Sequence, residues 1–273
     1  MYYVFNQTCI GYSHLKDKKP CQDFSASYQD NERIIITCCD GHGGAKYVRS
    51  QYGSKAASDA VLNIFKSIDR SFFYGLEEDK LVDKIKLLIL CEYNRIIENY
   101  ISEKPLRKSE LVDLSEDDAD SIRFNQAKAY GTTLSGAMIF QKRLIVVSIG
   151  DTEALGIRKG EIVKLFDNSN DPAGNITYSM CQEDAYNYLR VVVLPVNEFD
   201  GVLLCTDGMS SPYQSYVNFN NSFIRPTVRK VLNTRSLDGV ETHVKQLASE
   251  LGVGDDVSLS FIINKMTNVK FYR

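Results

Sequence analysis

The chain has 273 residues, of which 44% are hydrophobic and 25% are charged, and its formal net charge is -3 at pH 7. These values are typical of a globular protein, and sheet-rich chains of this length often fold around one core, so we expect a single domain over residues 1–273. A slightly acidic balance offers no broad basic surface, which argues against nucleic acid as a main partner.

The cysteines and the N-terminal sequence predict a cytoplasmic protein. The seven cysteines are odd in number and scattered, and none forms a Cys-x-x-Cys pair, which favours reduced thiols. The first residues lack a basic start and a long apolar stretch. No window approaches the roughly 20 apolar residues of a membrane span, so we expect no membrane partner.

Short apolar or alternating runs predict nine strands, which occupy residues 24–28, 33–39, 133–140, 144–149, 154–158, 161–165, 189–194, 201–206 and 257–263. Apolar residues at steps of four predict two helices between the second and third strands, over 48–64 and 81–97, and a third helix spans 240–251. Because the two long helices lie together rather than alternating with strands, this order argues against a doubly wound parallel sheet. It favours an α+β sandwich of antiparallel sheets covered by helices.

The stretch 102–128 is polar and charged and includes the acidic run 115–120. We interpret it as an exposed insertion rather than a domain linker. Acidic runs are most often solvated faces, so a solvated loop is favoured over an acidic binding tail.

Aspartates recur where apolar runs begin or end. Three runs end in an aspartate beside a glycine, and an acid opens each of two others; these residues are Asp40, Asp151, Asp207, Asp23 and the pair Asp255 and Asp256. In antiparallel sheets the start of one strand lies at the same edge as the end of its neighbour, so these acids can converge. A single Asp-Gly pair is explained by turn chemistry, but the recurrence favours a functional cluster.

Clustered carboxylates repel one another and need a cation. Oxygen ligands select hard ions such as Mg2+, Mn2+ or Ca2+, whereas zinc catalysis favours histidine or cysteine, and the chain has three histidines. Two hard ions about 3.5 to 4 Å apart activate water for in-line displacement at phosphorus. The residues alone therefore indicate a hard-metal site suited to hydrolysis of phosphate esters.

In order and spacing these motifs resemble the protein phosphatase 2C family, the metal-dependent protein serine/threonine phosphatases, over nearly the whole chain. The most specific motif is Asp40-Gly41-His42-Gly43-Gly44; the others are Ser13-His14 with Lys19-Pro20-Cys21-Gln22-Asp23, as in a mostly bacterial branch, then Gly131-Thr132-Thr133, Gly150-Asp151-Thr152, Thr206-Asp207-Gly208 and Asp255-Asp256-Val257-Ser258. The resemblance implies an αββα sandwich of two antiparallel sheets with the metal site at one edge between them.

The resemblance implies two bound Mg2+ or Mn2+ ions and a third, weaker one. Asp40 would bridge the two ions, the carbonyl of Gly41 would join it at one of them, and Asp207 and Asp255 would complete the other. Water activated between the ions would attack phosphorus directly, without a phosphoenzyme.

Four further residues receive less certain metal roles from the resemblance. Asp23 and Gln22 would act mainly through metal-bound waters, and Asp151 would help to hold the third ion. Asp256 stands where many relatives have asparagine, so its metal role is left open.

His42 is a candidate general acid for the leaving serine or threonine oxygen, because imidazole titrates near neutral pH; a capping or supporting role is the alternative. The family often places an arginine that grips phosphate five residues before the first-motif aspartate. Here that place is Lys18, followed by Lys19. Lysine lacks the bidentate fork of arginine, so these two residues are either weaker phosphate ligands or part of a solvated turn.

Residues 166–189 form a long irregular segment, which the resemblance identifies as a flap beside the active site that influences substrate choice. Its tyrosines, Tyr178, Tyr186 and Tyr188, are expected to pack rather than to contact substrate.

The function implied is hydrolysis of phosphoserine and phosphothreonine in proteins, with a phosphoprotein as partner, such as a Ser/Thr kinase or its targets. The alternative is a catalytically dead relative that binds a phosphoprotein; retention of Asp40, Asp207 and Asp255 argues against it, since repelling acids would be kept for no gain. A cysteine-nucleophile phosphatase is excluded because no cysteine is followed six residues later by an arginine. A nuclease would need basic tracts that are missing, whereas small phosphoesters stay open as substrates.

Overall fold

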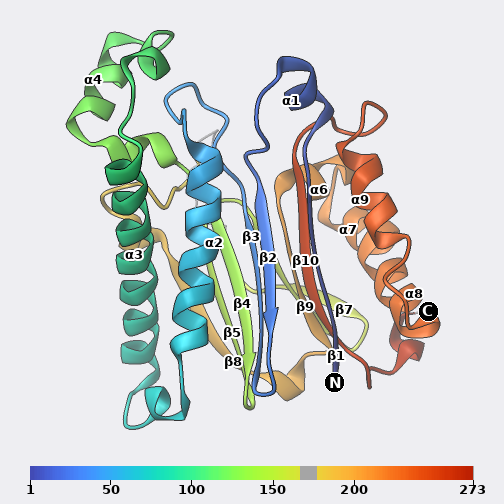
Figure 1. The fold of residues 1–273 in the computed structure, drawn as a ribbon. Coiled ribbons are helices and arrows are strands. Elements are labelled where there is room, and N and C mark those ends of the chain that lie inside the picture. The colour runs from blue at the N-terminus through green and yellow to red at the C-terminus, as the bar shows by residue number, and fades with distance from the viewer. Residues whose placement is uncertain (167–176, 273) are drawn as a thin grey trace.

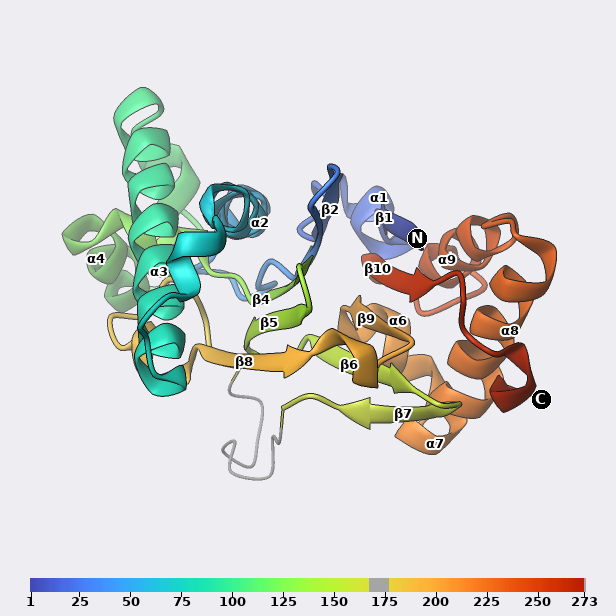
Figure 2. The same cartoon turned by 90° about the horizontal axis from the view of Figure 1, so that it is seen from below.

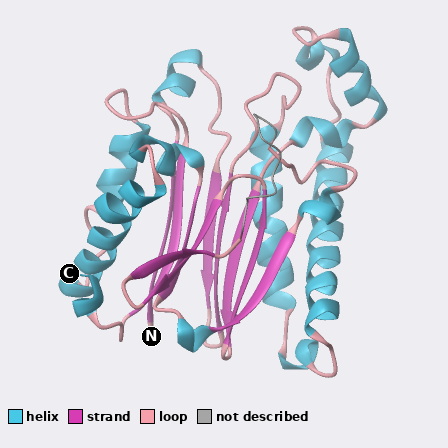
Figure 3. Cartoon of the chain, turned by 180° about the vertical axis from the view of Figure 1, so that it is seen from behind, coloured by secondary structure: helices cyan, strands magenta, loops and turns pink. Residues whose placement is uncertain are grey.

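Two antiparallel sheets pack face to face, and helices cover the outer face of each. The computed structural model describes residues 1–166 and 177–272, and all statements on the fold refer to these residues. Figure 1 shows the two sheets edge-on between α2 and α3 on one side and α8 and α9 on the other, and Figure 3 shows the same layers from behind. The predicted αββα sandwich is confirmed.

Each sheet has five strands with antiparallel neighbours. The first follows the order β1 (Tyr2–Cys9), β10 (Val257–Asn264), β9 (Gly201–Cys205), β6 (Glu153–Arg158) and β7 (Glu161–Lys164). The second follows β2 (Phe24–Gln29), β3 (Arg33–Cys39), β4 (Leu134–Phe140), β5 (Arg143–Ile149) and β8 (Arg190–Pro195). All nine predicted strands are present.

The sequences of the strands are continuous apolar runs because both faces of the strands are buried. Successive side chains point to opposite faces of a sheet. In β3, Ile35 joins the core beneath the helices, whereas Ile34 and Ile36 join the core between the two sheets. In β9, Leu203 packs beneath the helices of its own sheet, and Leu204 packs between the sheets.

The helices confirm the three predictions and add others. Long helices α2 (Ser50–Ser67) and α3 (Glu78–Glu103) cover the second sheet, and α8 (Arg225–Thr234) and α9 (Val240–Ala248) cover the first, as Figure 2 shows from below. The shorter helices are α1 (Tyr12–Asp17), α4 (Glu116–Phe124), α5 (Ala185–Tyr188), α6 (Asp207–Ser210) and α7 (Tyr216–Phe219), and single turns of other helix types lie at 70–73, 108–111, 126–130, 196–198, 211–213, 220–224 and 269–272. In the described part of the chain, no helix combines the length and apolar character needed to cross a bilayer.

The stretch 102–128 is not the solvated loop that its composition predicts, because it contains α4. The Ser115 hydroxyl accepts a hydrogen bond from the Asp118 amide at 3.2 Å, which caps the helix. Acidic residues occupy the first turn, where the positive end of the helix dipole favours them. Ala119 and Ile122, three residues apart on one face, are buried against the core.

Candidate active site

Strand ends gather the predicted acids at one end of the sandwich, where Figure 1 labels α1 and α6. There β3, β5 and β9 end just before aspartates, while the antiparallel β2 and β10 begin just after them. A cavity of about 370 Å³ opens at this end. It is lined by His14, Gln22, Asp23, Asp40, Gly41, His42, Gly43, Asp151, Asp207, Asp255 and Asp256, so it brings together all six aspartates that the sequence singled out.

The Gly-Thr-Thr motif holds the backbone of Asp40. The Asp40 amide donates to the Thr133 hydroxyl at 2.9 Å, and the Thr132 hydroxyl donates to the Asp40 carbonyl at 2.8 Å. On the other side, the Gly41 amide donates to the Gln22 carbonyl at 3.1 Å. A Cβ at position 41 would lie 2.5 Å from that carbonyl oxygen, so only glycine allows this close approach.

The carboxylates that face the cavity are electrostatically unfavourable as free anions. Burial raises the pKa of Asp40 well above its ordinary value, and the charges of Asp23 and Asp207 raise it further. Burial likewise raises the pKa of Asp207, with added repulsion from Asp151 and Asp255. This donor set fits a hard cation, whose charge would offset the repulsion.

The acids form an open cavity rather than a closed coordination cage. Within residues 1–166 and 177–272, no group of three or more His, Cys, Asp or Glu side chains is arranged so that it could hold one ion. The two-ion arrangement that the motifs imply would also use the Gly41 carbonyl and water, which are not side-chain ligands.

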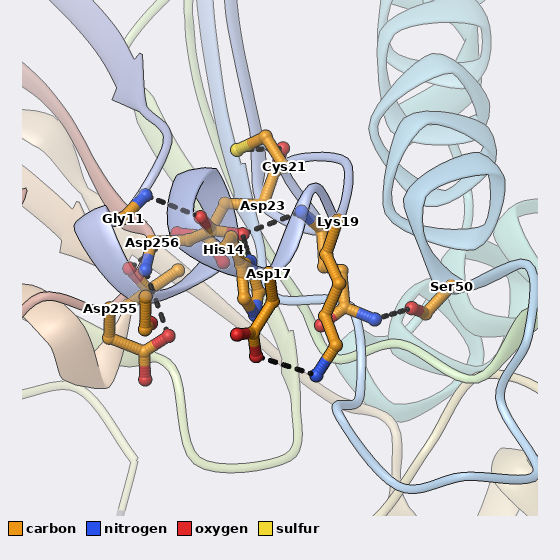
Figure 4. A network of polar contacts seen from close by, with 12 residues as sticks. Gly11, His14, Asp17, Lys19, Cys21, Asp23, Ser50, Asp255 and Asp256 are labelled. Carbon is orange, nitrogen blue, oxygen red and sulfur yellow. Dashed lines mark hydrogen bonds and ion pairs between the residues drawn. The ribbon is translucent and has the colours of Figure 1, made fainter.

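Asp256, whose metal role the sequence leaves open, is held by hydrogen bonds (Figure 4). Its Oδ1 accepts from the Gly11 amide at 2.7 Å, and its Oδ2 accepts from the Gln22 amide at 2.6 Å. Oδ2 also lies 3.0 Å from His14 Nδ1. With both oxygens engaged, this carboxylate ties the α1 segment to the start of β10.

Asp23 is buried and is partly satisfied by the protein. Its Oδ2 accepts from the Thr206 hydroxyl at 2.8 Å, and the same hydroxyl accepts from the Ser258 amide at 3.0 Å. Burial raises the pKa of Asp23, whereas the Thr206 hydrogen bond lowers it. Thr206 and Ser258 were not predicted as site residues; their only sequence signal is their place inside two aspartate motifs.

The His42 ring is wedged between a tyrosine and a glycine. Its backbone amide donates to the Gly131 carbonyl at 3.1 Å, and its ring lies 4.9 Å from that of Tyr47, centroid to centroid. A Cβ on Gly131 would lie 2.2 Å from Tyr47 Cδ1 and 2.9 Å from His42 Cδ2. Nε2 of His42 is buried without a hydrogen-bond partner among the described residues, and burial lowers its pKa. Sequence reasoning missed Tyr47.

Gln22 connects the His42 loop to the start of α2. Its Nε2 donates to the Ser50 hydroxyl at 2.6 Å, drawn in Figure 4, and lies 3.4 Å from the His42 carbonyl. Its main chain meanwhile bonds Gly41 and Asp256. Gln22 thus contacts the motif loop through its carbonyl and its side chain and Asp256 through its amide, and its predicted action through metal-bound water stays a prediction.

Lys18 and Lys19 do not line the cavity. Lys18 ends α1 in the left-handed conformation with φ 55° and is exposed. Lys19 Nζ lies 3.5 Å from Asp17 Oδ2, and Figure 4 shows the two side chains directed toward each other. Their predicted phosphate contact requires them to reach the cavity from this exposed position.

Asp151 occupies the exposed turn between β5 and β6. Gly150 before it has φ +89°, a conformation that glycine adopts without strain. Asp151 Oδ2 accepts from the Thr177 hydroxyl at 2.8 Å, which links this turn to the described part of the predicted flap.

The predicted flap, 166–189, falls partly outside the described residues, since 167–176 are not described. In the remainder, the rings of Tyr178 and Tyr188 stack at 3.7 Å, and the Tyr186 hydroxyl donates to Asp83 Oδ1 at 2.8 Å. All three tyrosines therefore contact other residues of the protein, although Tyr186 is exposed, and their packing role stays a prediction.

Two sheets flanked by helices, with an acid-lined cavity at one end, define a metal-dependent phosphatase. The family model described as "Protein phosphatase 2C" matches residues 10–251, and the chain belongs to this family of protein serine/threonine phosphatases. None of the curated protein sequences matches it significantly.

Solved structures share the fold at low sequence identity. A bacterial serine phosphatase is 17% identical, with 98% of this chain and 100% of that chain covered and a TM-score of 0.60. The catalytic domain of the serine/threonine phosphatase PstP, in complex with two manganese ions, is 16% identical with 96% and 97% covered and a TM-score of 0.56. Stp1 from Staphylococcus aureus is 15% identical with 96% and 95% covered and a TM-score of 0.54.

Proposed function

We propose that the chain hydrolyses phosphoserine and phosphothreonine in proteins by direct attack of a water activated between two Mg2+ or Mn2+ ions. The observation that carries this proposal is the single cavity into which five separate segments direct aspartates. When bound, the ions supply an activated water and stabilise charge on the phosphoryl oxygens. The two manganese ions in the PstP structure support the choice of metal.

Asp40 and Asp207 are the strongest candidates for ligands. Asp40 is partly buried and Asp207 is exposed at the same cavity; the pKa values of both are raised, so they gain most from a nearby cation. Asp255 is exposed at the same cavity, where, among residues 1–166 and 177–272, its Oδ1 accepts only the adjacent Asp256 amide at 2.9 Å and its second oxygen has no donor. The Gly41 carbonyl would add a neutral oxygen, as hard cations accept.

Asp23, Gln22 and Asp151 are assigned supporting roles. Asp23 already has the Thr206 hydroxyl as a donor, which fits contact with metal-bound water better than direct ligation. Asp151 is exposed at the cavity rim and fits a weaker third ion.

His42 is proposed as the group that delivers a proton to the leaving alkoxide of serine or threonine. Its buried Nε2 has no partner in the described chain, and its ring lines the acid-lined cavity. Burial lowers the pKa of His42, which makes the protonated imidazole a stronger acid while reducing the fraction protonated at neutral pH. Lys18 and Lys19 remain the proposed phosphate ligands, and for Lys19 this requires release from Asp17.

One observation favours the alternative, a catalytically dead relative that binds a phosphoprotein. The described acids do not form a closed group for one ion, so the site as it stands could bind a partner without holding metal. The presence of all the implied ligands in one cavity is the stronger argument for an enzyme, because clustered like charges are costly without a cation.

The deciding experiment compares hydrolysis of phosphoserine, phosphothreonine and phosphotyrosine peptides with Mn2+, with Mg2+ and with EDTA. We expect turnover of the first two peptides with either metal and none in EDTA. Calorimetric titration of Mn2+ into the chelated protein provides an independent readout and should give two sites. Turnover that persists in EDTA would refute the metal mechanism, and peptide binding without turnover would establish the alternative.

A further inference from the structure

A second hollow, here called the side cavity, adjoins the acid-lined one. Its volume is about 370 Å³, and it is built from the loop after the Asp-Gly-His motif, from α4 and from residues 181–184 of the predicted flap. The two cavities meet at a pair of rings, since His42 lines the first, Tyr47 lines the second, and their centroids are 4.9 Å apart. Figure 1 shows α4 at the same end of the sandwich as α1 and α6.

The floor of the side cavity is apolar. It includes the ring of Tyr47, the buried side chain of Ile122 from α4 and the half-buried thiol of Cys181. Burial raises the pKa of Cys181, so this thiol is neutral at physiological pH. A floor of this kind suits the aliphatic stem of a long side chain.

The charges around this floor have an acidic excess. Lys128 Nζ lies 3.7 Å from Glu183 Oε1 and 3.2 Å from the Ser121 hydroxyl, so Lys128 and Glu183 offset each other. Two carboxylates remain in the lining, Asp118 on α4 and Asp184 in the described part of the predicted flap.

Lys46 is the cation that opposes these two carboxylates. Its Nζ lies 5.1 Å from the centroid of the Tyr47 ring, and within the described residues it forms no ion pair. Asp118 lies near the same ring, because its charge contributes, after burial and Cys181, to the raised pKa of Tyr47. The lining therefore carries one more free negative than positive charge.

We propose that the side cavity is a substrate subsite for an arginine or lysine side chain close to the phosphorylated residue. The stem would lie on Tyr47 and Ile122, and the cationic head would reach Asp118 and Asp184. Arginine fits best, because its planar guanidinium bonds carboxylates in a bidentate manner and stacks on aromatic rings. An extended chain advances about 3.3 to 3.6 Å per residue, so a position two or three residues from the phosphorylated one is within reach. This inference rests on the proposed function, whose acid-lined cavity would hold the phosphorylated residue.

The test is a set of phosphothreonine peptides in which one position at a time, up to three residues on either side, carries arginine, alanine or glutamate. With the wild-type protein in Mn2+, we expect kcat/KM to be highest for arginine at one or two adjacent positions. In the double variant Asp118→Asn, Asp184→Asn this preference should fall by roughly 3- to 10-fold, the size of lost charge-assisted contacts. Hydrolysis of the alanine peptide and of a small aryl phosphate should be unchanged.

Two further variants serve as controls: one removes a negative charge elsewhere on α4, and the other removes a positive charge from the side cavity. Asp117→Asn removes the same charge from the same turn of α4 at a residue that does not line the side cavity, and it should leave the preference intact. Lys46→Gln removes the opposing cation and should increase the preference for arginine. Circular dichroism of each variant checks that α4 is retained.

Three results would overturn the subsite. They are equal kcat/KM for arginine and alanine at all positions, an arginine preference that survives the double substitution, and a glutamate preference that depends on Lys46, which would assign an anion instead. Fluorescence anisotropy of the same labelled peptides on the wild-type protein reads the preference without turnover. If no peptide is hydrolysed, the proposed function fails, while anisotropy still decides whether arginine binds through Asp118 and Asp184.

Discussion

Two adjacent residues, Asp255 and Asp256, show how differently the same side chain is used on the two sides of one strand start. Asp256 is 4% exposed, and its oxygens contact the Gly11 amide, the Gln22 amide and His14. Asp255 is exposed and, within the described part of the chain, accepts only the amide next to it (Figure 4). Both acids line the cavity, but the oxygens of Asp256 are engaged by donors of the protein, whereas Asp255 retains a free oxygen among the described residues.

The contrast extends to the whole acidic end of the sandwich. Asp23 and Asp256 are held acids, because hydroxyl or amide donors of the chain satisfy them. Asp40 and Asp207 are open acids, which face the cavity and one another; their pKa values are raised, as is that of Asp23. Substitution of a held acid should therefore lower the stability of the fold, whereas substitution of an open acid should reduce metal binding and turnover.

The largest effect is expected from an open acid. Asp207→Asn keeps the shape of the side chain but removes one ligand charge, so we expect about a 1000-fold or greater loss of Mn2+-dependent turnover. The free energy of unfolding of the metal-free protein should not fall, because a repelling charge is removed. Peptide hydrolysis and urea denaturation measure the two quantities, and an unchanged rate would mean that Asp207 is not a ligand.

The next effect is expected from a held acid. Asp256→Ala leaves two buried amides and His14 without their acceptor, and it should lower the free energy of unfolding by about 3 kcal/mol. Asp256→Asn, which retains an acceptor oxygen, should cost less. Urea denaturation in EDTA separates this effect from metal binding; a variant as stable as the wild type would show that Asp256 is not a structural residue.

A smaller effect is expected at the donor to the other held acid. Thr206→Val preserves shape but removes the hydroxyl that joins Asp23 to the Ser258 amide, so the free energy of unfolding should fall by about 1.5 kcal/mol. Thr206→Ser keeps the hydroxyl and is the matched control. Equal stability of the valine and serine variants would contradict the assignment.

Much of this end of the molecule could be predicted from the sequence, since apolar runs bounded by Asp-Gly mark strand ends directly. The division into held and open acids could not. This division depends on hydrogen bonds such as that between Thr206 and Asp23, which are 183 residues apart in the sequence. It also depends on which of the adjacent Asp255 and Asp256 is bonded by the protein. The sequence motifs predict that the acids lie at one edge of the sheets, but they do not identify the groups that donate hydrogen bonds to each carboxylate.

The regions that sequence reasoning missed have compositions that conceal their packing. The acidic residues of α4 predict a segment that is exposed to solvent. Ser115 nevertheless caps the helix, and Ala119 and Ile122 lie on one buried face. In β1 no face is clearly polar, because Tyr3 and Phe5 pack under the helices while Tyr2 and Val4 pack between the sheets. An edge strand that is half-buried on both faces gives no clear alternation.

The smallest effect concerns pH and tests the open acids as a group. Their pKa values are raised in the folded state above the unfolded value of about 4, so between these limits the folded protein binds more protons than the unfolded chain. The stability that protonation contributes is fully present below pH 4 and is lost as pH rises through the folded pKa values. The metal-free protein should therefore lose a few degrees of Tm from this source between pH 5 and 7.5, and Mn2+ should restore them.

Other groups titrate in the same range, and buried His42 opposes the trend because burial lowers its pKa. The informative quantity is thus the difference between the wild type and Asp207→Asn, measured by calorimetry in EDTA at each pH. The variant has one open acid fewer, so its Tm should decline less steeply from pH 5 to 7.5. Parallel Tm profiles would mean that ionised Asp207 does not destabilise the metal-free protein. Asp207 would then not be an open acid, and the distinction between held and open acids would be wrong.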